Sequence, residues 1–153
     1  AKLTKLGHKL SREALEVQGL VPGRYTLTID GAEVGTYSDA QLARHVELQE
    51  NAKTPQHQQA AQVAELNSQR NSSPVRALRG EWSQFQRYAR AKRTAEMQPD
   101  NATVQAQFVE WTKKIEGMDE RVAAHIAAAK EIEDKIFEVN QPQPRKYVLT
   151  LVK

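Results

Sequence analysis

The sequence predicts an α+β protein in which a small antiparallel β-sheet carries a long antiparallel α-helical hairpin. Three observations predict it: strand-like alternation within residues 13–37, apolar residues spaced by three and four within 74–138, and a second strand-like run at 146–152. We therefore expect residues 1–37 and 146–153 to form the sheet, and residues 38–140 to form an inserted helical arm. A chain of 153 residues suits one ordinary domain, or a small domain with a helical extension.

The composition excludes several classes of protein. The absence of cysteine rules out disulfides, thiolate metal sites and a cysteine nucleophile. No run approaches the roughly 18 apolar residues of a membrane-spanning helix. The net charge of +3 is too small to indicate nucleic acid binding by itself. Because the chain starts at Ala1 without methionine or a signal-like stretch, we expect it to be processed or cut from something longer.

The first predicted element is a β-hairpin. Residues 24–29 alternate with period two, and the residues that share one face are Tyr25, Leu27 and Ile29. Asp30 and Gly31 are typical of a type I′ turn, and 33–37 is the return strand. Leu15 and Val17 alternate before a turn at 19–23, and the Leu-x-Pro-x-x-Tyr spacing that ends at Tyr25 resembles a tyrosine corner.

Capping residues then mark helix starts. Ser38 and Asp39 should cap a short helix over 40–46. Thr54 as N-cap with Pro55 at the first helical position predicts a helix to about residue 69. Residues 71–74, Asn-Ser-Ser-Pro, repeat the start signal, so we expect a new helix there.

The helical hairpin is predicted from two apolar stripes. The first consists of Val75, Leu78, Trp82, Phe85 and Ala89. A break at 98–101 precedes one long helix over 101–138, whose stripe consists of Val104, Phe108, Trp111, Ile115, Met118, Val122, either His125 or Ile126, Ala129, Ile132 and Ile136. We expect neither Gly80 nor Gly117 to stop its helix. A short turn between two amphipathic helices favours antiparallel packing, and the charges agree, being +4 over 74–98 and −3 over 101–138.

The strand at 146–152 follows a Gln-Pro-Gln-Pro segment that should end the last helix. Its residues are apolar on both faces. A lone strand must pair, so we expect it to join the sheet of 13–37, although residues outside this chain could equally complete that sheet.

We expect no catalytic residue, no cofactor and no metal in this chain. The histidines, His8, His45, His57 and His125, show no metal spacing, and the sequence lacks a phosphate loop, HExxH and Gly-x-Ser-x-Gly. Three aromatics, Trp82, Tyr88 and Trp111, are candidate interface or carbohydrate-stacking residues, with core packing the favoured interpretation. The basic run 87–93 has the pattern of a nucleic-acid patch, but the acidic companion helix should neutralise it.

Residues 17–31, VQGLVPGRYTLTIDG, and 34–38, VGTYS, resemble the region that follows the catalytic domain in bacterial SGNH/GDSL-type esterases. The segment 54–60, TPQHQQA, is similar to the Gln/Ala-rich helix of those proteins, whereas 45–49, HVELQ, departs from their usual Gly-Val-Asn-Leu-Ala. The family's Gly-Asp-Ser and Asp-x-x-His blocks are absent, so no catalytic residue can be assigned. Acyl transfer would lack both a histidine-activated hydroxyl nucleophile and hydrogen-bond donors for the oxyanion.

The resemblance implies a non-catalytic C-terminal accessory region of an SGNH-hydrolase-like esterase. It also implies an extracytoplasmic bacterial setting and a catalytic domain of the same protein as the partner, and the arm could mediate homo-oligomerisation. The alternative is a free-standing helical-hairpin interaction module with no enzymatic parent. A second apolar stripe, including Val109 and Phe137, would favour a protein partner.

Overall fold

The computed structural model describes residues 13–152 and has an α+β fold with two small antiparallel sheets and long helices. The chain divides into two compact units, Ala1–Val63 with Val139–Lys153, and Ala64–Glu138. We call them the sheet unit and the arm unit. The short helix after the hairpin and the first turns of the next helix therefore belong to the sheet unit, whereas the sequence had placed the boundary at residue 38.

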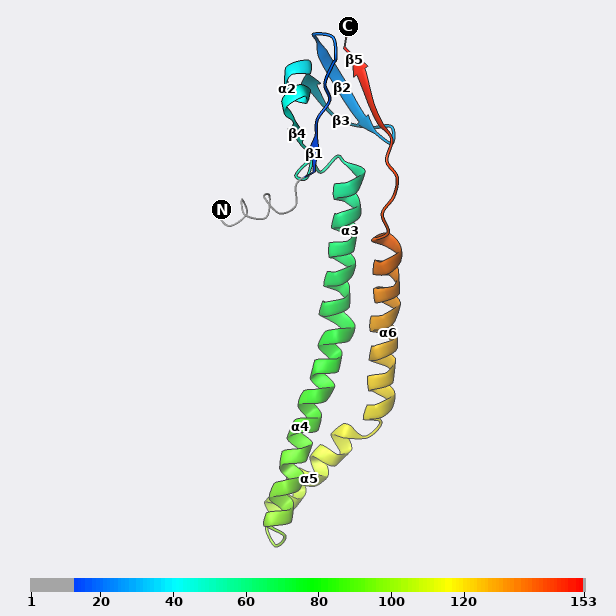
Figure 1. Cartoon of the computed structure of the whole chain (residues 1–153). Helices are drawn as coiled ribbons and strands as arrows, with labels where there is room; N and C mark the ends of the chain where they lie inside the picture. Colours follow the sequence, from blue (N-terminus) through cyan, green and yellow to red (C-terminus); the bar gives the residue numbers. More distant parts are fainter. Residues whose placement is uncertain (1–12, 153) are drawn as a thin grey trace. The chain divides into compact units, whose positions relative to one another are not determined.

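The main sheet has three strands in the order β3-β2-β5 (Figure 1). The strands β2 (Arg24–Ile29) and β3 (Ala32–Ser38) form the predicted hairpin, and β5 (Tyr147–Leu151) pairs antiparallel with the other edge of β2. Asp30 and Gly31 have φ values of 52° and 86°, as the type I′ turn requires. The prediction that the C-terminal strand completes this sheet is confirmed.

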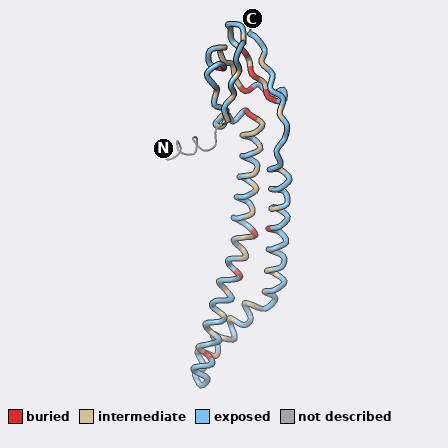
Figure 2. The backbone as a smooth tube through the Cα atoms, viewed as in Figure 1, coloured by how far each residue is buried: buried red, intermediate tan, exposed pale blue. Residues whose placement is uncertain are grey.

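The core of the sheet unit lies on one face of β2. Tyr25, Leu27 and Ile29 are buried as the alternation predicted, and buried residues gather along this strand in Figure 2. Leu27 and Ile29 form one hydrophobic cluster with Val34 and Leu48. The Tyr25 hydroxyl donates a hydrogen bond to the Val21 carbonyl at 2.9 Å, which confirms the tyrosine corner.

A second, two-stranded sheet pairs β1 (Ala14–Leu15) with β4 (Val46–Glu47). The short helix α2 (Asp39–Arg44) begins with a Ser38 capping box, as expected, but ends two residues before the predicted limit. The reason is that Val46 pairs with Leu15 in this sheet instead of continuing the helix. The first strand thus joins a separate small sheet and not the hairpin.

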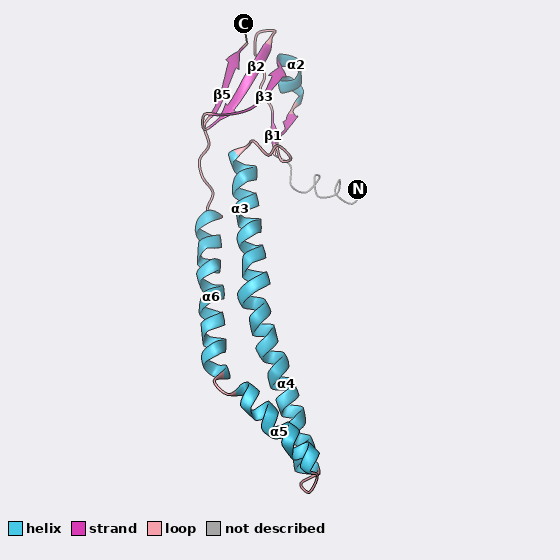
Figure 3. Cartoon of the chain, turned by 180° about the vertical axis from the view of Figure 1, so that it is seen from behind, coloured by secondary structure: helices cyan, strands magenta, loops and turns pink. Residues whose placement is uncertain are grey.

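One continuous helical stretch follows, formed by α3 (Pro55–Arg70), η1 (Asn71–Val75) and α4 (Arg76–Met97), as Figure 3 shows. The expectation that a new helix starts at 71–74 is wrong. The chain instead forms a π-helical turn containing Pro74. Because proline has no backbone N–H and its ring crowds the preceding turn, the wider π turn lets the helix pass through it.

The last predicted helix is two helices, α5 (Ala102–Ile115) and α6 (Met118–Val139). The expectation that Gly117 would be tolerated within one helix is wrong, since its φ of +66° ends the helical hydrogen bonding. Arg121 donates to the carbonyls of Glu116 and Lys114 at this break, at 2.6 and 3.2 Å. Gly80 does lie inside an unbroken helix, as expected.

In the arm unit, α4 packs antiparallel against α5, and Arg121 of α6 bonds Glu81 of α4. The predicted stripe on α5 and α6 is confirmed at every position from Val104 to Ile136, with His125 and not Ile126 on the inner side, because Ile126 is 54% exposed. The predicted stripe on α4 is wrong in its second half. Trp82, Phe85 and Ala89 are exposed, and the inward positions are Glu81, Gln84, Tyr88, Ala91 and Ala95.

Within the described residues, none of the helices combines the length and apolar character needed to cross a membrane.

Candidate functional site

The aromatic residues singled out in the sequence lie in the arm unit. Trp82 stacks on Phe85 with ring centroids 5.7 Å apart, and Tyr88 stacks on Phe108 across the helix pair at 5.9 Å. Phe85 and Tyr88 are 6.3 Å apart, so these four rings form one series of contacts. Only the Trp82–Phe85 end faces outward; Tyr88 is half-buried between α4 and α5.

Trp111 stands apart from that series. Its ring is approached by the Lys114 ammonium at 4.3 Å and by the Arg87 guanidinium at 5.6 Å, both cation–π distances. The three candidates Trp82, Tyr88 and Trp111 therefore do not form one flat platform of the kind that stacks on a sugar. Trp82 with Phe85 is the part that a ligand or partner could reach.

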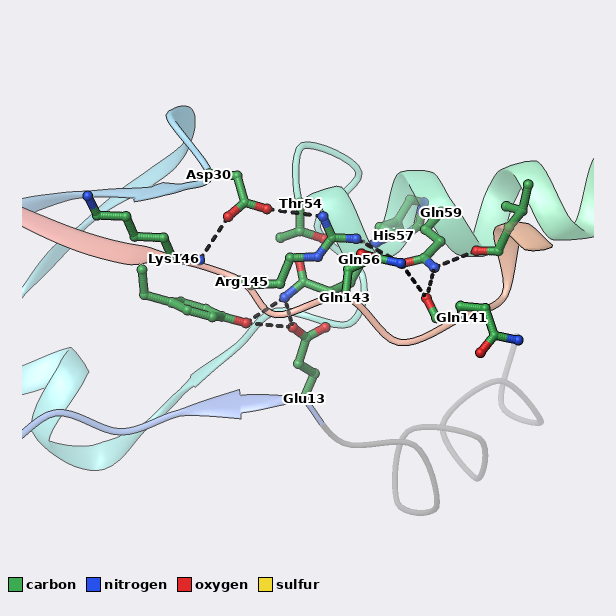
Figure 4. Close-up of polar contacts among 12 residues, drawn as sticks. Glu13, Asp30, Thr54, Gln56, His57, Gln59, Gln141, Gln143, Arg145 and Lys146 are labelled. Atoms are coloured by element: carbon green, nitrogen blue, oxygen red, sulfur yellow. Dashed lines mark hydrogen bonds and ion pairs between the residues drawn. The ribbon is translucent and has the colours of Figure 1, made fainter. Parts of the chain in front are cut away.

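A second candidate is a polar cluster in the sheet unit, which we call the polar junction (Figure 4). It contains Glu13, Asp30, Gln56, Gln59, Arg145 and Tyr147. Arg145, just before β5, donates to an Asp30 carboxylate oxygen at 3.0 Å and to the Gln59 side-chain oxygen at 2.8 Å. The other Asp30 oxygen accepts the Lys146 backbone N–H at 2.8 Å.

The rest of the polar junction joins the start of α3 to β5 and β1. Gln56 donates to the Glu13 carboxylate at 2.7 Å and to the Tyr147 hydroxyl. Gln59 donates to the backbone carbonyls of Val139 and Gln141. Side chains from the hairpin turn, the first turns of α3 and the segment before β5 are thereby held together.

Local sequence explains why α3 presents these amides. Thr54 is buried and acts as the N-cap predicted for this helix, its hydroxyl oxygen accepting the His57 backbone N–H at 3.2 Å and donating to the Asn51 carbonyl at 2.9 Å. A fixed helix start sets the rotation of the first turns. Gln56 and Gln59 are three residues apart, so they project from the same side of α3.

The electrostatics of the polar junction suit a structural role. The Lys146 N–H and then the Arg145 guanidinium lower the pKa of Asp30, which keeps this carboxylate ionised. Burial, together with the nearby Glu13 carboxylate, raises the pKa of the Tyr147 phenol, which keeps it protonated. An ionised, fully engaged carboxylate and a neutral phenol are poor general bases and nucleophiles at neutral pH.

The histidines likewise take structural positions. His57 Nδ1 lies 3.4 Å from the Gln49 carbonyl oxygen, His45 Nε2 lies 3.3 Å from a Glu47 carboxylate oxygen, and His125 is on the inner side of α6. His8 is outside the described residues. From residue 13 to 152, no group of three or more His, Asp and Glu side chains could hold a metal ion.

Sequence reasoning missed the polar junction. Asp30 was noticed only as a turn residue, and Arg145 lies 115 residues away from it. The single usable signal was the Thr54–Pro55 helix start, which fixes where Gln56 and Gln59 project.

Comparison with known proteins gives one informative similarity. No protein-family model matches the chain, and no curated protein sequence matches it. The chain is similar to the solved structure of BT4096, a gut microbial diltiazem-metabolizing enzyme, with a TM-score of 0.63 and 28% identity. The match covers 93% of this chain but 34% of that enzyme, so the chain spans about a third of its length.

Proposed function

We propose that this chain is a non-catalytic accessory region of an SGNH/GDSL-like esterase, which supports or covers the catalytic domain. The observation that carries the proposal is the extent of the structural similarity: nearly all of this chain matches a third of an enzyme. The resemblance of residues 17–38 and 54–60 to the region after an SGNH catalytic domain supplies the type of parent. The same resemblance suggests an extracytoplasmic bacterial setting.

The side chains of the sheet unit support a structural role. Most polar groups of the polar junction bond one another or the backbone, the buried Gln56 Oε1 being an exception, and the pKa shifts of Asp30 and Tyr147 favour the forms that make their bonds. An accessory region needs such fixed geometry, because it must hold its surfaces in place against a neighbouring domain.

The test is to compare the purified chain with its complete gene product. We expect no hydrolysis of p-nitrophenyl acetate by the chain above the buffer rate. We expect the gene product to extend upstream through a Gly-Asp-Ser block and to hydrolyse the ester, with loss of activity when that serine is replaced by alanine. Hydrolysis by the chain alone, or a gene product that starts near residue 1, would contradict the proposal.

The alternative is a free-standing helical-hairpin interaction module. It is favoured by the large apolar side chains that the arm unit leaves exposed, among them Trp82, Val109, Ile126 and Phe137. A gene product that starts near residue 1 and binds a protein partner would support this alternative.

A further inference from the structure

The exposed ring pair of α4 has an unusual setting, and we call it, with the side chains that flank it, the aromatic patch. Trp82 is 58% exposed and Phe85 is 39% exposed, although both are large apolar residues in the middle of a helix. The inner side of the same helix turn is occupied instead by Glu81, whose carboxylate receives two bonds of 2.9 Å from Arg121. The charged pair thus takes the inner position, and the aromatic pair faces outward.

The aromatic patch has a basic end. On the side toward the C-terminus of α4, the two rings border a shallow groove of about 410 Å³ whose other lining residues include Ala89, Arg90 and Arg93. Neither arginine makes an ion pair within the described chain. Their charges are therefore available to a partner.

The aromatic patch also has an acidic end. On their other side the same two rings border a groove of about 530 Å³ whose remaining lining is Ile115, Gly117, Met118, Asp119 and Glu120. The bond from Arg121 to Glu81 places the start of α6 level with the residue before Trp82. The acids therefore lie toward the N-terminal side of the rings and the arginines toward the C-terminal side.

We propose that the aromatic patch binds the same patch of a second copy of this chain, forming a two-fold symmetric dimer. A surface with apolar rings at its centre, cations at one end and anions at the other is complementary to itself under a two-fold rotation. The rotation sets Trp82 and Phe85 of one copy against those of the other. It also sets Arg90 and Arg93 against Asp119 and Glu120 at both ends.

Charge complementarity selects this occupant over others. An acidic helix would satisfy only the basic end, and a nucleic acid or an anionic membrane would be repelled by Asp119 and Glu120. The antiparallel copy satisfies both ends while burying the rings at the centre, where interface energy concentrates. The proposal does not depend on the esterase resemblance, because every residue that it uses lies in this chain.

The first experiment is sedimentation equilibrium of the full chain over a concentration series reaching roughly 100 µM. We expect a reversible monomer–dimer equilibrium. Trp82→Ala should raise the dissociation constant roughly a hundredfold, since both copies lose their central ring. Met97→Ala is the matched control, because Met97 is 75% exposed and lines neither groove, and it should change nothing.

The second experiment tests the charge pattern. The double variants R90E/R93E and D119K/E120K should each dimerise roughly tenfold more weakly, because each places like charges together at both ends. Mixed in equal amounts, the two double variants should form a heterodimer at least as tight as the wild-type dimer. At each end of that heterodimer, acidic side chains of one copy face basic side chains of the other. Circular dichroism establishes that each variant keeps its helices.

Three results would overturn the proposal. The first is a chain that stays monomeric at the highest concentration, and the second is a Trp82→Ala variant that dimerises like the wild type. The third is a mixture of the two double variants whose dissociation constant is no lower than that of either variant alone. If the chain is monomeric but binds a separately produced upstream domain through Trp82, the aromatic patch is an interdomain surface and not a dimer contact. That result would leave the accessory function standing.

Discussion

Asp30 is the residue on which two features of the sheet unit depend. Its φ of 52° makes it the first central residue of the hairpin turn, and its carboxylate holds the chain as it enters β5. Aspartate tolerates the left-handed conformation better than most residues, and as a carboxylate it can accept bonds from both Arg145 and the Lys146 N–H. The same side chain therefore takes part in the turn and in holding the entry to β5, which is also attached by its backbone pairing with β2.

Replacing Asp30 by Asn should destabilise the protein in a pH-dependent way. The pKa of Asp30 is lowered in the folded state, so its contribution is present above the usual carboxyl pKa and is lost as the pH falls through the lowered value. The wild type should be more stable than Asp30→Asn at about pH 7, and the difference should shrink toward about pH 3. Urea unfolding at both pH values measures it.

The control for this prediction is Asp100→Asn, which removes a carboxylate from the exposed turn between α4 and α5. A difference between wild type and Asp30→Asn that does not vary with pH would contradict the electrostatic explanation and leave only a geometric one.

At the scale of elements, apolar spacing predicted one helix face correctly and the other only in part. On α5 and α6 the predicted stripe faces inward, while three other large apolar residues, Val109, Ile126 and Phe137, lie outside it and are exposed. On α4 most of the predicted stripe is exposed. A neighbouring stripe packs inward instead, and it consists of Glu81, Gln84, Tyr88, Ala91 and Ala95. The Arg121 that compensates for burying Glu81 lies 40 residues away, so no pattern local to α4 reveals it.

The same limit explains why the polar junction could not be predicted. Its bonds join residues separated by as many as 134 positions, as between Glu13 and Tyr147, and amides and charged groups show no periodicity that distinguishes partners from solvated residues. Strands, turns and caps were predictable, because their signals lie within a few residues of one another.

The two glycines of the helical hairpin should respond to alanine with opposite signs. Gly80 lies within α4 with open space at its Cβ position, so Gly80→Ala should stabilise the chain by about 0.5–1 kcal/mol. Gly117 has a φ of +66° between α5 and α6, so Gly117→Ala should destabilise it by about 1 kcal/mol. Thermal unfolding of each variant measures both effects, and an equal response at the two positions would contradict the assignment of Gly117 as a true helix break.

At the scale of the whole molecule, the chain contains two compact units, and its core residues divide between them. Leu27→Ala should remove about 2–5 kcal/mol from the sheet unit, because Leu27 is fully buried in its core. We expect hydrogen exchange to accelerate together in β2, β3 and β5 and to change little in α4, α5 and the middle of α6. Ile132→Ala, on the inner stripe of α6, should give the reverse pattern, and equal acceleration in both units would show that the chain unfolds as one.

The pairing of β5 with β2 has a consequence for synthesis of the protein on the ribosome. Ile29 pairs with Tyr147, and the whole helical arm is translated between them, which takes on the order of ten seconds. Throughout that interval the edge of β2 that will pair with β5 has no partner, although the apolar residues of the hairpin have already been translated. An unpaired strand edge of this kind is a template for pairing with other strands until β5 has been made.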